Sequence, residues 1–442
     1  MTFSEADSYQ DAKTTSRRRF LGLAAAGATA TSLGAGAFLL GKDNDPRLPT
    51  VDGRVTSGST GSVAQQSSNP PAALTKAGPL ADRTLIIIEL EGGNDGLATL
   101  IPYGSGALRN LRPDLLHEEE ELVMLDDEMA LNPSLAGLNE QGIAVLEGIG
   151  STDGILSHFE MSQLWWEGAT SIDDRRHTGF LGRLCDQLDV GDPLTGLSIG
   201  GNGHVPQLIA EKATTLGLAD ADAGWFFREE GEFFEHFRKS LLSMSATSTG
   251  GELMNAARHG STQAIEFADM LGGFDPEERP VEYPGSDLAN SLAVAANLMR
   301  SDSGVRIIHV PLGGFDTHDD QRGTHDYLLM ELDEALVAFR NDLASDGLDA
   351  STLIATTSEF GRRPKSSDSG TDHGNASMAL LAGPITLGRH GESPSLTRLD
   401  EEDNLAPTTP MAEYYATLAN WFEIDPSLVL SGKPKPIPGI LI

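Results

Sequence analysis

Continuous aliphatic and β-branched runs, each next to a polar or glycine-rich loop, constrain the fold of this chain more than any other feature. They occur at 85–90, 143–146, 305–312 and 351–357, and again in "SMALLAGP". Such runs are typical of strands that are buried on both faces of a sheet. Amphipathic helical patterns, such as "HDYLLMELDEALVAFRNDLAS", lie between them. The alternation predicts an α/β fold with a mostly parallel sheet that is covered by helices on both faces.

Acidic and histidine-bearing loops fall at the carboxyl ends of these runs, where open α/β sheets bind their ligands. The candidate metal ligands are Asp95, Asp316, His318, Glu359, Asp372 and His373. Carboxylates alone would repel one another in one crevice, and the interspersed imidazoles favour zinc, iron or manganese over calcium. A pair of metals about 3.5 to 4 Å apart is the usual device for activating an oxygen nucleophile. We therefore expect one or two divalent metal ions.

Several of these residues also have a purely structural interpretation. Asp95 can stabilise a tight glycine turn, and Asp316 can cap the helix that follows it. Ser157 is either the N-cap of a helix or a nucleophile, and the two are compatible because a helix N-terminus binds anions. The histidines that we assign to the surface or the core, and leave out of the metal set, are His158, His177, His204, His309 and His325.

The charge of the chain argues against nucleic-acid binding, and its cysteine content excludes an intrachain disulfide. The chain has 31 Lys and Arg against 65 Asp and Glu, a formal net charge of −34. This charge repels nucleic acid and anionic lipid, so we exclude nucleic acid as a partner. The single cysteine, Cys185, cannot form an intrachain disulfide, and we expect it to be a small buried side chain.

The first 82 residues read as a targeting segment and a tether. Residues 1–41, with Arg17 and Arg18 before an Ala/Gly-rich apolar run, resemble a twin-arginine export signal. Residues 42–82 have the Ser/Gly/Pro/Gln bias of a flexible linker, and 83–442 form the folded domain. We expect the twin-arginine translocase as a partner and a periplasmic, extracellular or cell-surface location. A small-residue cleavage site ends at Ala37, and an uncleaved leader that acts as an anchor is the alternative.

Seven motifs in order resemble the exported DUF1501 family, which is similar to the alkaline phosphatase and sulfatase superfamily. They are "LEGGNDGL", "SHFE", "HTGFLGR", "GGFDTH", "TSEFGR", "GTDHGN" and "PTTPMAEYYATLANWF". The resemblance implies a three-layer α/β/α sandwich with two metals bridged by substrate oxygens. It implies that Asp95 binds one metal and that Asp316, His318 and His373 bind the other. Phe360, after Glu359, stands where the superfamily has a histidine, which removes one imidazole from a metal site.

The motifs lead to two functional hypotheses. The first is an exported metal-dependent hydrolase of phosphate or sulfate esters, acting on a small anionic ester or a polysaccharide. Ser157 would attack, and Asn94 or Arg362 would hold the anionic group; a surface salt bridge is the alternative for Arg362. No Cys/Ser-x-Pro-x-Arg motif occurs, which argues against a formylglycine sulfatase. The second hypothesis is a non-catalytic cell-surface binding or assembly protein that keeps the fold. The sequence leaves the oligomeric state open.

Overall fold

A computed structural model describes the folded part of the chain and little of the leader. The described residues are 36–39, for which only the strand is given, and 76–188, 194–201, 203, 205–220, 231–246, 251–272, 281–301 and 303–442. The predicted signal and linker lie outside the described residues, apart from 36–39 and 76–82. Within the described ranges, no helix is long and apolar enough to cross a membrane.

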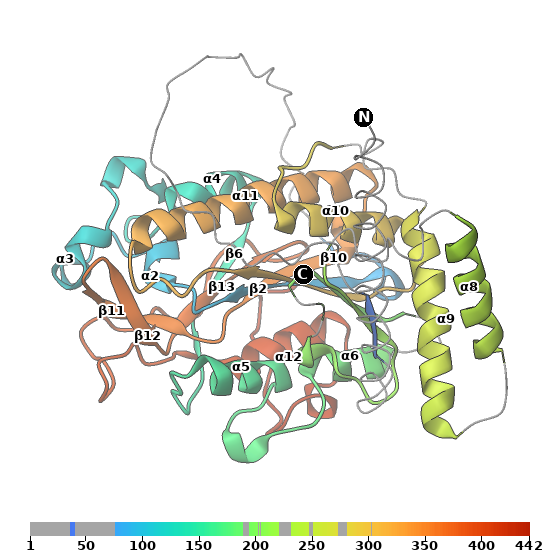
Figure 1. Ribbon diagram of the computed structural model, residues 1–442. Helices are drawn as coiled ribbons and strands as arrows, with labels where there is room; N and C mark the ends of the chain where they lie inside the picture. The colour runs from blue at the N-terminus through green and yellow to red at the C-terminus, as the bar shows by residue number, and fades with distance from the viewer. Residues whose placement is uncertain are drawn as a thin grey trace, which may run out of the picture.

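A ten-stranded sheet forms the middle layer of the molecule (Figure 1). Its strands, in spatial order, are β1 (Gly36–Leu39), β8 (Thr215–Leu218), β7 (Gly196–Ile199), β9 (Ile307–Gly313), β2 (Thr84–Glu91), β10 (Thr352–Thr357), β13 (Ser377–Ala382), β6 (Ala144–Gly150) and β14 (Gly388–His390). The short β15 (Thr409–Pro410) also pairs with β6. Strand β13 is antiparallel to both of its neighbours, and the other pairings in this sheet are parallel. The predicted mostly parallel sheet is confirmed.

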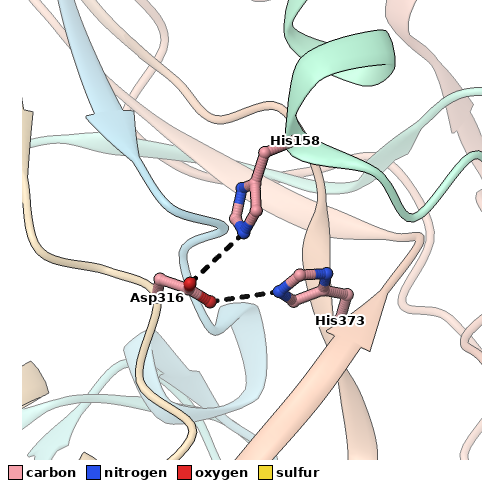
Figure 2. A group of neighbouring side chains, drawn as sticks. All are labelled: His158, Asp316 and His373. Carbon is pink, nitrogen blue, oxygen red and sulfur yellow. Dashed lines mark hydrogen bonds and ion pairs between the residues drawn. The ribbon is translucent and has the colours of Figure 1, made fainter.

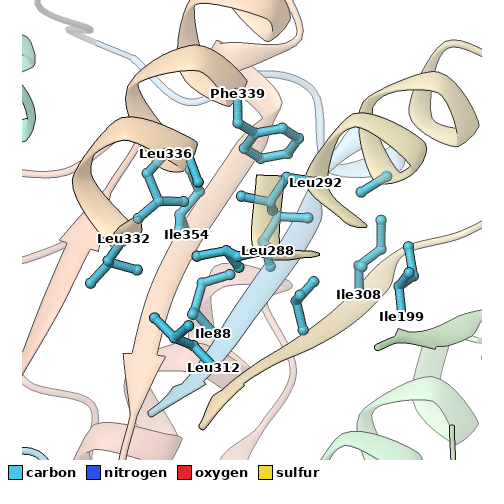
Figure 3. Packing of buried hydrophobic residues seen from close by; sticks show 14 of the residues in the cluster. Ile88, Ile199, Leu288, Leu292, Ile308, Leu312, Leu332, Leu336, Phe339 and Ile354 are labelled. Carbon is cyan, nitrogen blue, oxygen red and sulfur yellow. The ribbon is translucent and has the colours of Figure 1, made fainter. Parts of the chain in front are cut away.

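Helices cover both faces of the sheet, which explains why the strands are apolar throughout (Figure 1). One face carries α4 (Ala136–Gln141), α10 (Asp287–Arg300) and α11 (Gln321–Ser345); the other carries α5 (His158–Glu167), α6 (Phe180–Leu188) and α12 (Met411–Trp421). Along β2, Ile86 and Ile88 belong to one core, and Leu85 and Ile87 belong to the opposite core. Figure 3 shows Ile88 packed under α10 and α11. Alternate side chains of one strand thus enter two different cores. The three-layer α/β/α sandwich is confirmed.

Smaller elements surround the central sheet. Strands β11 (Gly361–Ser367) and β12 (Gly370–Gly374) form a hairpin, and β3 (Leu100–Ile101), β5 (Ala130–Leu131) and β4 (Val123–Met124) form a small sheet. The remaining α-helices are α2 (Gly96–Thr99), α3 (Gly106–Leu111), α8 (Glu232–Ser245) and α9 (Glu252–Gly272). Short 3₁₀ helices occupy Leu80–Asp82, Pro113–Leu115, Glu119–Glu121, Pro133–Leu135, Ile172–Asp174, Pro206–Leu208, Asp349–Ser351 and Pro426–Leu428.

The order of the strands brings the predicted loops together. Strands β9, β2 and β10 are parallel neighbours, so the loops that follow them leave the same edge of the sheet. The β11–β12 hairpin follows β10 after three residues, and α5 follows β6, which is parallel to this group. Four segments that lie far apart in the sequence therefore meet at one edge.

Candidate metal centre

Three side chains from three of these segments form a compact cluster (Figure 2). His158 is the first residue of α5, Asp316 follows β9, and His373 lies on β12. The distance is 3.4 Å from His158 Nε2 to Asp316 Oδ2 and 3.1 Å from His373 Nε2 to Asp316 Oδ1. One ligand atom of each residue lies within 4.8 Å of those of the other two. This spacing allows all three to bind one metal ion.

Both histidines are held from behind through the ring nitrogen that faces away from the cluster. His158 Nδ1 lies 2.7 Å from Glu359 Oε1, and His373 Nδ1 lies 2.8 Å from the carbonyl oxygen of Leu156. A carbonyl oxygen can only accept, so His373 donates from Nδ1. The same assignment for His158 leaves a lone pair on both Nε2 atoms, which is the usual arrangement of metal-binding histidines. His158 Nε2 is also buried without a hydrogen-bond partner, as expected of an atom that binds an ion.

Asp316 is held in its charged form. Arg362 donates to Asp316 Oδ1 at 2.7 Å. Burial opposes the charge of this carboxylate, but the hydrogen bond from Arg362 and the positive charge of Arg362 outweigh burial and lower the pKa of Asp316 to about 2. The hydrogen bond with Glu359 raises the pKa of His158, although burial acts in the opposite direction. Asp316 is therefore ionised before an ion binds, whereas the raised pKa of His158 lets protons compete with a metal ion for this histidine.

His318 lies beside the cluster, in contact with Asp316 and His373 but outside the group of three, and its role as a ligand stays a prediction. Its Nε2 is 3.0 Å from Asp316 Oδ1 and 3.0 Å from His373 Nε2. Since the Nδ1 bond leaves His373 Nε2 without a proton, two ring nitrogens this close need a proton or a cation between them. Asp372 was also predicted to be a metal ligand. It lies behind His318, with its Oδ1 3.4 Å from His318 Nδ1. Asp372 is exposed and is positioned to orient His318.

Glu359 and Arg362 support the cluster from behind. Glu359 Oε1 accepts from His158 and, at 3.0 Å, from the backbone N–H of Gly92. Arg362 is fully buried and, besides Asp316, donates to the carbonyl oxygens of Gly92, Gly93, Phe315 and Thr371. Its donors tie the three loops together. In this arrangement Glu359 orients His158, and Arg362 holds Asp316 with a guanidinium that is not exposed to solvent.

The structure does not bring Asp95 into the cluster. Asp95 is buried, and its Oδ1 accepts from the N–H groups of Leu97 and Ala98, so that it caps α2. Its Oδ2 lies 2.6 Å from Arg112 Nη1. Burial opposes its charge, but the positive charge of Arg112 and the hydrogen bonds from Arg112 and Gln321 lower its pKa. The interpretation of Asp95 as a turn stabiliser matches this position, because a buried ion pair and a cap satisfy both of its oxygens.

Asn94 is also kept away from any substrate. Its Oδ1 lies 3.1 Å from Thr99 Oγ1 and 3.0 Å from His325 Nε2, and its side chain is buried. Burial lowers the pKa of His325 to about 4, so this histidine is neutral and belongs to the core, as expected from the sequence. The predicted role of Asn94 in holding an anion does not fit its position.

Ser157 occupies the N-cap position of α5, but its side chain makes no capping hydrogen bond. The sequence left N-cap and nucleophile open as compatible roles, and the structure places the residue at the N-cap position. Its hydroxyl is half-buried and directly precedes His158. The N–H groups of the first turn of α5 therefore lack a side-chain cap, and Ser157 as nucleophile stays a prediction.

His158 was not among the ligands predicted from the sequence, where it was assigned to the surface or the core. One sequence feature could have identified His158 as a ligand: it follows Ser157 at the start of a helix that comes after a buried strand. Phe360, in the position of the expected imidazole, is buried and packs against both histidines, with ring centroids 4.8 Å from His158 and 4.6 Å from His373. The loop after β10 thus carries the phenyl ring of Phe360 in place of an imidazole, and α5 supplies the imidazole of His158.

We expect Glu359→Gln to weaken metal binding by roughly 10 to 100-fold while the protein stays folded. The amide has the shape of the carboxylate but lacks the charge that fixes the tautomer and basicity of His158. A competition titration of Zn²⁺ against a chromophoric chelator measures the change. Glu334→Gln, an exposed change on α11, is the matched control. Equal affinities for the two variants would contradict the proposed support of His158.

Comparisons with known proteins identify the family and leave the activity open. A family model described as "Protein of unknown function (DUF1501)" matches residues 132–427, more than half of the chain. No curated protein matches the sequence.

Solved structures that are similar include three proteins. The first is the C-terminal periplasmic domain of EcEptC from Escherichia coli in complex with Zn, which is 10% identical, with a TM-score of 0.38. The matched region covers 79% of this chain and 85% of that domain. A mutant of the alkaline phosphatase PafA is 10% identical, with a TM-score of 0.40 and coverage of 83% and 100%. The PsFucS1 sulfatase from Pseudoalteromonas sp. is 12% identical, with a TM-score of 0.32 and coverage of 80% and 73%. At these scores the likeness assigns no role to any residue.

Proposed function

We propose that this chain, which belongs to the DUF1501 family of proteins of unknown function, is an exported metal-dependent hydrolase of phosphate or sulfate esters. The observation that carries the proposal is the convergence of His158, Asp316 and His373, whose ligand atoms lie within 4.8 Å of one another. Each histidine is fixed through Nδ1, so both Nε2 atoms are free for an ion. Export rests on the twin-arginine leader, which lies largely outside the described residues.

His158, Asp316 and His373 would hold one ion, and His318 lies beside them. A set of imidazoles with one carboxylate favours zinc, iron or manganese. When bound, such an ion acts as a Lewis acid that polarises an ester oxygen and makes a nearby hydroxyl easier to ionise. Among the described residues this is the one group of three or more ligands in range, which supports the lower of the two expected metal numbers.

Ser157 would serve as the nucleophile, and the start of α5 would bind the anion. The Ser157 oxygen forms a bond to phosphorus or sulfur as the bond to the leaving alcohol breaks, and water then releases the inorganic anion. The uncapped N–H groups of this ten-residue helix favour negative charge at that place. They take over the role first assigned to Asn94 and Arg362. A small anionic ester or a charged polysaccharide fits this chemistry.

We expect Ser157→Ala to abolish turnover and to leave the metal content unchanged. The substitution removes the attacking oxygen, which is typically worth more than about 10³-fold in rate, but removes no ligand. The assay measures hydrolysis of p-nitrophenyl phosphate and p-nitrophenyl sulfate by protein purified without chelator, alongside elemental analysis. Ser162→Ala, five residues further along the chain in α5, is the matched control and should keep both activity and metal. Full activity of Ser157→Ala would remove Ser157 from the mechanism.

One observation favours the alternative function, a non-catalytic binding or assembly protein. Phe360 has a phenyl ring where the resemblance to the superfamily implies an imidazole. In that case the wild-type protein would bind about one metal ion per chain but would hydrolyse neither aryl ester. The same two measurements therefore distinguish the two functions.

A further inference from the structure

A cavity of about 580 Å³ opens at the same edge of the sheet as the metal centre but shares no lining residue with it. Its walls come from α2, from the end of β6, from the start of β13 and from the segment 393–397. Cavities of roughly 300 to 1,000 Å³ are the usual size for small-molecule sites. Because β13 is antiparallel, its start lies at the edge where β2 and β6 end.

The interior of this cavity is apolar, and its polar groups are already bonded. The leucine and methionine side chains that line it are Leu97, Leu100, Met129, Met378, Leu396 and Leu405. Glu147 is buried in the wall, where Arg389 Nε donates to it at 2.8 Å and Ser393 also donates to it. Ser377 donates its hydroxyl to the backbone oxygen of Asn94 at 2.9 Å. A ligand would therefore gain mainly by placing an apolar body inside.

The rim of the cavity carries uncompensated negative charge. Asp127 and Glu128 line the cavity and are exposed. Neither carboxylate has an ion pair or side-chain hydrogen bond with the residues that the structure describes, whereas their neighbour Asp126 is paired with Arg389 at 2.7 Å. The described lining includes no Lys or Arg. The rim therefore attracts cations and repels the anionic esters proposed for the metal centre.

We propose that this cavity binds a small amphiphilic cation, an aliphatic or aromatic body that carries an ammonium group. The body fills the apolar interior, and the ammonium group lies between Asp127 and Glu128 at the rim. The charge of the rim selects against neutral and anionic molecules with the same body. This site is independent of the metal centre, and its ligand differs in charge from the proposed substrate.

Isothermal titration calorimetry with three probes of one chain length tests the proposal. n-Octylammonium should bind with a stoichiometry of one and roughly tenfold more tightly than n-octanol, and n-octyl sulfate should not bind. Asp127→Asn/Glu128→Gln should bring the affinity for n-octylammonium down to that for n-octanol. Raising the salt concentration should weaken n-octylammonium and leave n-octanol unchanged.

Control variants separate the site from the general acidity of the protein. Glu232→Gln/Glu266→Gln on α8 and α9 removes the same charge away from the cavity and should leave all three affinities unchanged. Ala107→Trp, which places an indole in the wall, should weaken both n-octylammonium and n-octanol. Binding of the three probes with equal affinity, absence of n-octylammonium binding, or equal losses in both charge variants would each overturn the proposal.

Discussion

Replacement of His158 by Ala should reduce the metal content from about one ion per chain to a trace. The change removes one of three ligands whose atoms lie within 4.8 Å of one another. It also leaves Glu359 without the partner that its Oε1 meets at 2.7 Å. Two protein ligands rarely hold a transition metal against dialysis, because structural sites use four and catalytic sites use three. Elemental analysis after dialysis measures the loss.

A histidine elsewhere provides the control for this experiment. His177 is exposed and lies outside the cluster, so His177→Ala should keep the full metal content. His373→Ala should behave like His158→Ala. If His158→Ala kept its metal while His318→Ala lost it, the ligand set would instead centre on His318, Asp316 and His373.

Asp95→Ala should destabilise the protein by about 3 to 5 kcal/mol and leave the metal content unchanged. The substitution leaves the buried guanidinium of Arg112 without the carboxylate that it meets at 2.6 Å. It also removes the cap that Asp95 provides to the N–H groups of Leu97 and Ala98. Urea denaturation measures the free energy of unfolding. Glu235→Ala breaks an exposed ion pair with Lys239 and should cost less than about 0.5 kcal/mol.

The effect of Asp95 also predicts a pH dependence. The pKa of Asp95 is lowered in the folded protein. Its stabilisation is therefore fully present above the unfolded pKa of about 3.9 and is lost as the pH falls through the lower folded value. The stability difference between the wild type and Asp95→Ala should shrink below about pH 4. Loss of metal from Asp95→Ala at neutral pH, without loss of stability, would restore Asp95 as a ligand.

The layers of the fold could be predicted from short stretches of sequence. Runs such as Leu85–Leu90 are apolar at every position because helices cover both faces of the sheet, and this pattern is visible without knowing any partner. The position of Asp316 at the end of such a run was predictable for the same reason, since parallel strands end at a common edge.

The roles within the site could not be predicted, because they depend on pairs that are remote in the sequence. His158 and Glu359 are 201 positions apart and meet only when α5 packs beside the loop after β10. Arg362 donates hydrogen bonds to the carbonyl oxygens of Gly93, after β2, and of Phe315, after β9. No local pattern near "TSEFGR" predicts these contacts.

The sequence by itself determined the α/β architecture, the strand-end loops and the acidic character of the chain, because these follow from local burial patterns and from composition. The tertiary structure alone decided that His158 joins Asp316 and His373, and that Asp95 pairs with Arg112 away from the cluster. The physical reason is that a ligand set is defined by distances of a few ångströms between side chains. Such distances depend on the packing of whole elements and not on the residues near each ligand in the sequence.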